Sequence, residues 1–199
     1  MGYPPDRTGR HMSNSPPSST PPAPTAALSG ASWMGWLGAV WGLSGVVLLL
    51  LSAVWRLSPI AWDALTGPLS TVQAGFAGFW VLFMAYTEGY KGFQKAFSPR
   101  VVVRATWLRD HPKPWLVLLA PLFCMGMVHA TRKRMMVSWI LMVVIVGFVI
   151  AVKLLPAPWR GLVDAGVVVG LTWGLAAMAA SLWQTFRGRP PVVPADVPA

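Results

Sequence analysis

Four stretches of this sequence are apolar over about the length that a helix needs to cross a membrane. They cover residues 33–55, 69–86, 137–155 and 162–183, and roughly 20 residues of helix span the hydrocarbon core of a bilayer. Hydrophobic residues make up 55% of the chain and charged residues only 11%, which leaves too little polar surface for a water-soluble domain of this size. The sequence therefore predicts an all-α integral membrane protein that crosses the membrane several times.

Polar, proline-containing segments flank the predicted membrane domain of residues 31–186. Residues 1–30 are rich in Pro, Ser and Thr, and ordering them would cost conformational entropy without burying apolar surface. We predict that they form a disordered cytoplasmic arm and that residues 187–199 form a disordered Pro-rich tail. The sequence is compatible with a translation start at Met1 or at Met12.

A fifth apolar segment, residues 115–130, is short for a membrane crossing and contains Pro121 and Gly126. The favoured interpretation is a re-entrant segment, which gives four transmembrane helices in all. The alternative is a fifth transmembrane helix. Between the first two spans, Arg56 and Asp63 are predicted to mark the turn.

The distribution of basic residues favours four crossings. The chain has 16 Lys and Arg against six Asp and Glu, a net charge of +10, and cytoplasmic loops of membrane proteins carry the excess of Lys and Arg. Four crossings with a cytoplasmic N-terminus place 13 basic residues inside and three outside, whereas five crossings place ten inside and six outside. The sequence thus predicts a bacterial-type plasma (inner) membrane protein with both termini cytoplasmic.

Residues 87–114 are predicted to form a basic, amphipathic platform on the cytoplasmic side. Aromatic side chains recur there at helical spacing, and Ser98-Pro99 is predicted to end one helix and begin the next. Such a platform can rest on anionic lipid or receive a partner protein, although the charges could also serve topology alone. The predicted contact residues are Tyr90, Lys91, Lys95, Arg100, Arg104, Arg132, Lys133 and Arg134.

Three polar residues within or beside the apolar segments are candidates for function, namely Gln73, Glu88 and His129. For Glu88 the favoured interpretation is structural, a surface pair with Lys91 three residues later. Near His129, Cys124 and Met125 could supply soft metal ligands, but they do not complete a ligand set. No metal and no cofactor is predicted.

Two glycine stripes indicate close helix packing. The favoured interpretation is that the first and last spans pack on each other, and the alternative is contact with a partner or a second copy of the chain. The first stripe consists of Gly35, Gly38, Gly42 and Gly45, and the second of Gly166, Gly170 and Gly174.

The sequence carries no nucleotide-binding loop, no metalloprotease motif and no nucleophile motif, and no catalytic residue is predicted. We expect a non-enzymatic protein of accessory, assembly or scaffolding type, with anionic lipid as a partner and with a protein partner or homo-oligomer as a further expectation. Nucleic acid is not expected, because no nucleic-acid-binding motif accompanies the charge. A small transporter or channel acting as a homo-oligomer is the first alternative, and a membrane-embedded lipid enzyme is the second.

Overall fold

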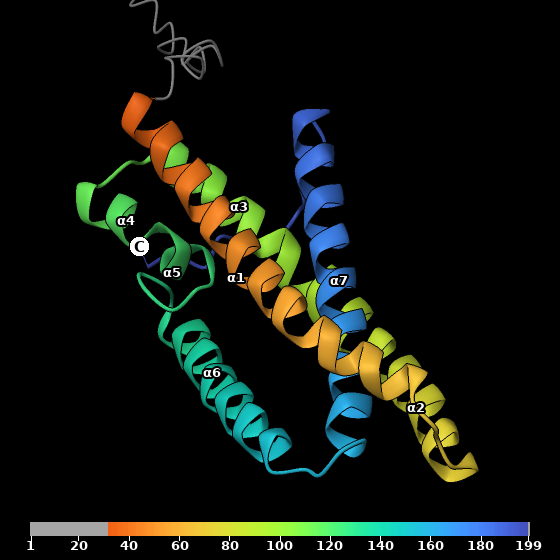
Figure 1. Cartoon of the computed structure of the whole chain (residues 1–199). Coiled ribbons are helices and arrows are strands. Elements are labelled where there is room, and N and C mark those ends of the chain that lie inside the picture. Colours follow the sequence, from red (N-terminus) through yellow and green to blue (C-terminus); the bar gives the residue numbers. More distant parts are fainter. Residues whose placement is uncertain (1–31, 199) are drawn as a thin grey trace, which may run out of the picture. The chain divides into compact units, whose positions relative to one another are not determined.

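The structure, a computed structural model, describes residues 32–198. About 80% of the described residues are helical and none of them forms a strand, which confirms the predicted all-α fold class. The predicted arm of residues 1–30, and with it the choice between Met1 and Met12, lies outside the described residues. Figure 1 shows the order of the helices along the chain.

Three of the described helices are long and apolar enough to cross a membrane. They are α1 (Trp33–Thr66), α6 (Arg132–Lys153) and α7 (Trp159–Phe186). Helices α1 and α7 contain the predicted spans 33–55 and 162–183, and α6 contains most of the span 137–155. The predicted span 69–86 falls mainly on the shorter helix α2 (Thr71–Met84), which continues directly into further helix.

Helix α1 extends well past residue 55 and passes through Pro59. Arg56 and Asp63 lie on this helix, so the prediction that they mark a turn is wrong; the turn consists of residues 67–70. The helix continues because its last turns are packed against α7, where Gly161 lies against the side chain of Ala64. Tertiary packing of this kind outweighs the local cost of a proline in the helix.

Helix α2 is followed without interruption by the π-helix η2 (Ala85–Phe97) and by α3 (Ser98–Asp110). As predicted, one helix ends and the next begins at Ser98-Pro99, but the chain remains helical across this boundary. Ser98 has helical torsion angles, φ −57° and ψ −45°, and its hydroxyl donates to the carbonyl of Gly174 on α7 at 3.4 Å rather than capping a helix. A proline ring collides with the carbonyl four residues earlier in an α-helix, here that of Lys95, and the wider turn of a π-helix relieves this collision.

Residues 114–131 do not form one straight helix. They contain two short helices, α4 (Pro114–Leu118) and α5 (Ala120–Cys124), and the chain is then non-helical as far as Thr131. This segment is packed along the first half of α1, where Gly42 lies against Cys124 and Gly45 lies against Pro121.

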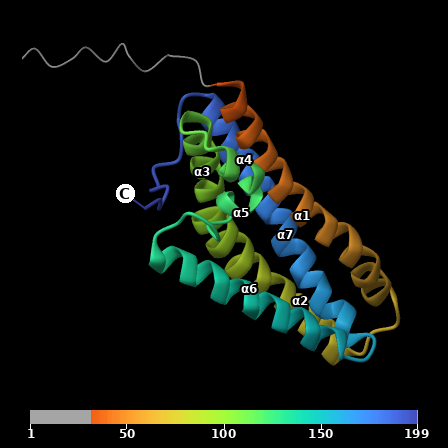
Figure 2. The ribbon, with the colours of Figure 1, turned by 90° about the vertical axis from the view of Figure 1, so that its left-hand side faces the viewer.

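The core forms where α1, the helical run of residues 71–110 and α7 meet. The run returns beside α1 in the opposite direction, and α7 follows the direction of the run, as Figures 1 and 2 show. Apolar side chains from α1, α3, α5 and α7 fill the space between them, and these include Val46, Leu108, Phe123 and Met178. Where these helices lie in a membrane, close van der Waals packing of these side chains holds them together, because lipid tails are as apolar as the side chains.

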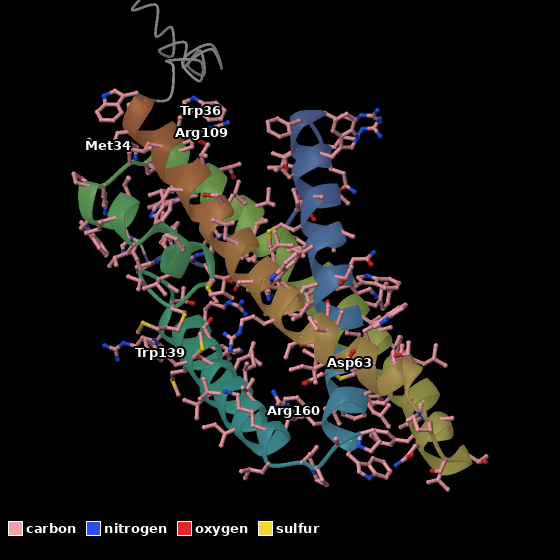
Figure 3. All side chains as sticks on the ribbon, viewed as in Figure 1. Met34, Trp36, Asp63, Arg109, Trp139 and Arg160 are labelled. Atoms are coloured by element: carbon pink, nitrogen blue, oxygen red, sulfur yellow. The ribbon has the colours of Figure 1, made fainter. Side chains whose placement is uncertain are left out.

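Helix α6 stands largely apart from this core. Only 6% of its most apolar 18-residue stretch is buried. Its exposed side chains include Val143 and Ile150 as well as Trp139, which Figure 3 labels. A helix that is apolar on all sides requires an apolar environment. The exposed apolar surface of α6 thus supports the prediction of a membrane protein.

The C-terminal segment after α7 lies against the helices. Residues 187–198 lack regular secondary structure, but the N–H of Thr131 donates to the carbonyl of Asp196 at 2.8 Å, and Val197 packs against the core. The sequence predicts a disordered tail, whereas in the structure residues 196 and 197 contact the folded helices and their loop.

Candidate functional site

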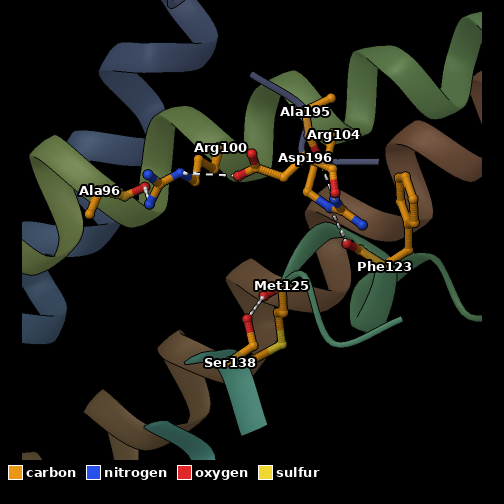
Figure 4. A network of polar contacts seen from close by, with 8 residues as sticks. All are labelled: Ala96, Arg100, Arg104, Phe123, Met125, Ser138, Ala195 and Asp196. Atoms are coloured by element: carbon orange, nitrogen blue, oxygen red, sulfur yellow. Dashed lines mark hydrogen bonds and ion pairs between the residues drawn. The ribbon is translucent and has the colours of Figure 1, made fainter. Parts of the chain in front are cut away.

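A buried arginine side chain connects three segments of the described chain through hydrogen bonds. Arg104 of α3 is only 2% exposed, and its guanidinium donates to main-chain carbonyls from two other parts of the chain (Figure 4). The acceptors are Phe123, Val128, His129 and Ala195. The same guanidinium lies 4.1 Å from the centroid of the Phe123 ring, an arrangement that adds a cation–π attraction.

The local fold explains why an arginine occupies this position. Because α5 ends at Cys124 and the chain is then non-helical, the carbonyls of residues 128 and 129 have no helical N–H partner. The carbonyl of Phe123 accepts from the N–H of Gly126 in the following turn at 3.0 Å and can accept a second donor. A guanidinium offers five N–H donors in a planar fork and can satisfy several such carbonyls at once. Burial lowers the pKa of Arg104 to about 10, so this group remains charged at neutral pH.

Two further arginines lie near the same centre. Nε of Arg100 is 3.7 Å from a carboxylate oxygen of Asp196 in the tail (Figure 4), and this nitrogen is buried without a hydrogen-bond partner among residues 32–198. The guanidinium of Arg134, in the first turn of α6, lies over the loop at Gly126 and within electrostatic range of Arg100 and Asp196. Three guanidinium groups thus lie within electrostatic range of one carboxylate, and Arg100 forms an ion pair with it.

The predicted contact residues do not form one surface. Arg104 is buried, and Arg100 and Arg134 are half-buried beside it. By contrast, Arg132 and Lys133 are exposed at the start of α6. Tyr90, Lys91 and Lys95 lie on η2, where Nζ of Lys91 is 4.8 Å from the Tyr86 ring and Nζ of Lys95 is 4.5 Å from the Tyr90 ring.

Glu88 lies between η2 and α7. One of its carboxylate oxygens is buried without a hydrogen-bond partner among the described residues, and it lies against Gly170. Lys91 contacts the Tyr86 ring instead of Glu88, so the predicted surface pair of Glu88 with Lys91 is wrong. A carboxylate without a partner between packed helices is energetically costly, and such residues often have a function.

Gln73 and His129 have other roles in the structure. The side chain of Gln73 accepts from the N–H of Ser70 at 3.0 Å, within a capping box that starts α2. His129 lies in the loop that follows α5 with a positive φ of 47°, and its ring contacts the rings of Trp107 and Trp115. Burial lowers the pKa of His129, and the positive charges of Lys113 and Arg104 add to this effect.

Helices α1 and α7 pack against each other, but the two glycine stripes do not face each other. Gly35 lies against the carbonyl of Arg109 at the end of α3, and the other glycines of the first stripe, Gly38, Gly42 and Gly45, lie against side chains of α3, α4 and α5. The second stripe contacts the helical run of residues 71–110, where Gly166, Gly170 and Gly174 lie against Trp80, Glu88 and Phe93. Both stripes allow a bulky neighbour or a backbone group to approach closely.

A groove of about 690 Å³ lies along the second half of α7. Its opposite walls come from Gln94, Pro99 and the tail residue Pro191. The indole N–H of Trp173 donates to the side-chain oxygen of Gln94 at 2.8 Å within it. The groove is otherwise mainly apolar, with small side chains such as Ala176 and Ala180.

No protein-family model, no curated protein and no solved structure matches this chain. Sequence reasoning included Arg104 among exposed contact residues and missed Asp196 altogether. One signal for the burial of Arg104 was present, because this residue shares a helical stripe with Val101, Ala105 and Leu108. No sequence signal indicates that Asp196 meets residues of α3.

Proposed function

We propose that this chain is a non-enzymatic membrane protein of accessory or scaffolding type. In this proposal it holds a folded basic region, residues 98–134, against anionic lipid or a partner protein at the inner face of a bacterial-type plasma membrane. The observation that carries the proposal is the Arg104 centre, which joins α3, the segment of residues 114–131 and the tail into one folded unit. Exposed Arg132 and Lys133 lie directly beside this unit.

The topology in this proposal has four crossings, made by α1, the first part of the helical run of residues 71–110, α6 and α7. Residues 114–131 support it, because they are folded against α1 as short interrupted helices instead of forming a crossing helix. With four crossings, 13 of the 16 basic residues lie on the cytoplasmic side. Of the other three, Lys153 lies at the end of α6 and Arg160 at the start of α7, the end of the bundle where Figure 3 shows Asp63 and Arg160.

A reporter fusion tests this topology directly. A reporter joined after residue 135 should report the cytoplasm, and the same reporter joined after residue 156 should report the opposite side. A periplasmic signal after residue 135 would contradict the four-crossing arrangement and favour five crossings.

Site-specific photo-crosslinking in intact membranes tests the function. Lys133 and Lys153 are a matched pair, because both are exposed lysines at opposite ends of α6. A photoreactive residue at position 133 should capture anionic lipid or one stoichiometric protein, whereas position 153 should not. Equal capture at both positions would contradict a specialised basic region.

A small transporter or channel is a second candidate function. The observation that favours it is the carboxylate of Glu88, which lies without a hydrogen-bond partner in the described structure between η2 and α7. This candidate predicts an ion or proton flux in proteoliposomes that Glu88→Gln abolishes and that Lys91→Gln leaves intact. A flux that both variants retain would contradict a transport role for Glu88.

A further inference from the structure

The arginine cluster beside the tail has more positive than negative charge. Arg100, Arg104 and Arg134 come from two helices, and Asp196 is the one carboxylate that the described part of the chain places among them. Arg104 has its donors occupied by carbonyls. Arg100 has a buried Nε without a hydrogen bond, and its side chain is about one-third exposed. The cluster can therefore still accept an anion from outside.

We propose that Arg100 and Arg134, supported by the charge of Arg104, form a binding site for an anionic phosphate group, which the carboxylate of Asp196 occupies in this structure. Guanidinium groups are well suited to phosphate, because their planar N–H forks match two phosphate oxygens at once. A phosphate also brings more oxygen acceptors than the one carboxylate oxygen that now faces Arg100 at 3.7 Å.

The contacts of Asp196 indicate an occupant that can be displaced. Its carboxylate meets Arg100 beyond ordinary hydrogen-bond length, and the side chains of both residues are partly exposed, so the ion pair contributes little stability. Its backbone lies in the left-handed region with φ 52°, which is uncommon for a residue other than glycine. The tail is otherwise attached through main-chain bonds of residues 195 and 196 and through Val197.

The source of the phosphate group follows from the proposed function, on which this part of the inference rests. If α6 begins at the cytoplasmic surface, Arg134 lies at the level of the lipid headgroups, where basic pockets between helices bind anionic lipid. Arg132 and Lys133 are exposed at the same end of α6 and would attract such a headgroup. A free phosphate ion would use the same chemistry without requiring this topology.

The position of the tail provides the test. A cysteine at position 197, introduced as Val197→Cys in a Cys124→Ala background, reports tail release through maleimide labelling, because Val197 is packed against the core. The full-length protein is placed in nanodiscs of phosphatidylcholine, with or without phosphatidylglycerol. Anionic lipid should increase the labelling rate about fivefold, the factor that corresponds to a partly exposed ion pair. Asp196→Asn should produce a similar increase without anionic lipid.

Matched arginine variants separate this site from general surface charge. Arg134→Gln should abolish most of the response to phosphatidylglycerol, whereas Arg189→Gln, which removes the same charge elsewhere, should retain it.

In a separate experiment, inorganic phosphate is added to phosphatidylcholine nanodiscs, with chloride at equal ionic strength as the control. Release by inorganic phosphate would support the site and identify a free ion as a ligand, whatever the topology.

Two results would overturn the proposal. One is a labelling rate that neither phosphatidylglycerol nor inorganic phosphate changes. The other is an equal loss of response in Arg134→Gln and Arg189→Gln, which would indicate diffuse electrostatics. A periplasmic reporter signal after residue 135, together with a response to inorganic phosphate, would contradict the proposed topology and leave the anion site intact.

Discussion

Replacing Arg104 with methionine removes the donors at the centre of the structure while keeping a long apolar side chain. The carbonyls of Phe123, Val128, His129 and Ala195 would lose their donors at this position. We expect the segment of residues 114–131 to open more often in this variant, while the long helices remain folded, because their own main-chain hydrogen bonds do not involve Arg104.

The size of the effect follows from two opposing terms. A buried acceptor that is left without a partner costs about 1–3 kcal/mol, and several acceptors are affected. Removing the guanidinium also removes its own cost of burial, which offsets part of this loss. Two or three unpaired carbonyls, reduced by this gain, leave a net cost of about 3 kcal/mol, so the open fraction of the segment should increase about 100-fold.

Cys124 provides the assay, because it is the one cysteine of the chain and is 1% exposed on α5. Burial raises the pKa of its thiol to about 12, and the thiolate is the reactive form. Maleimide therefore reacts with Cys124 mainly when the segment is open, and the labelling rate in membranes follows the open fraction.

Arg109→Met is the matched control, because Arg109 is partly exposed and pairs with the neighbouring Asp110. Its labelling rate should stay within about fivefold of the parent rate. Arg104→Lys keeps the charge with fewer donors and should give an intermediate rate, which is informative if the methionine variant does not accumulate. Equal labelling of Arg104→Met and Arg109→Met would refute the reasoning.

Two further predictions concern packing and pH. A methyl group on Gly35 would collide with the main-chain carbonyl of Arg109, so Gly35→Ala should destabilise the protein by about 1–3 kcal/mol and lower its thermal midpoint. Gly147→Ala is the control, because no atom beyond the adjoining backbone of its own helix lies within 4 Å of a Cβ at that position, and a lower midpoint in both variants would contradict the packing explanation. Burial holds the pKa of His129 below its usual value, so protonation favours the open state, and stability should be lost as the pH falls below about 6.5. As the pH falls over that range, the labelling rate of Cys124 in folded protein, divided by the rate in denatured protein, should rise. This ratio should stay constant in His129→Gln, and a rise in both proteins would assign the effect to another group.

The sequence alone determined the fold class. Long apolar runs require helices that are surrounded by apolar groups, and α1, α6 and α7 cover the strongest of these runs. The interruption of residues 114–131 also follows from local chemistry, because Pro114 and Pro121 limit how long a helix can be there. These features depend on neighbouring residues and can be predicted without knowledge of distant contacts.

Tertiary structure decided the features that local chemistry did not predict. Ser98 and Pro99 continue a helix because α7 supplies an acceptor at Gly174 and η2 widens before the proline. Glu88 faces Gly170 on α7 instead of the nearby Lys91. In both cases a contact with a helix more than 70 residues away in the sequence outweighed a local preference.

The arginine centre is the clearest case of this difference. From the sequence, Arg104 is one of several basic residues in a predicted surface platform, and only its place in the stripe with Val101 and Leu108 indicates burial. Its acceptors lie about 20 residues away near α5 and about 90 residues away in the tail. Whether a charged side chain is exposed or buried depends on where unpaired carbonyls gather in three dimensions, and only the folded chain brings those carbonyls to one place.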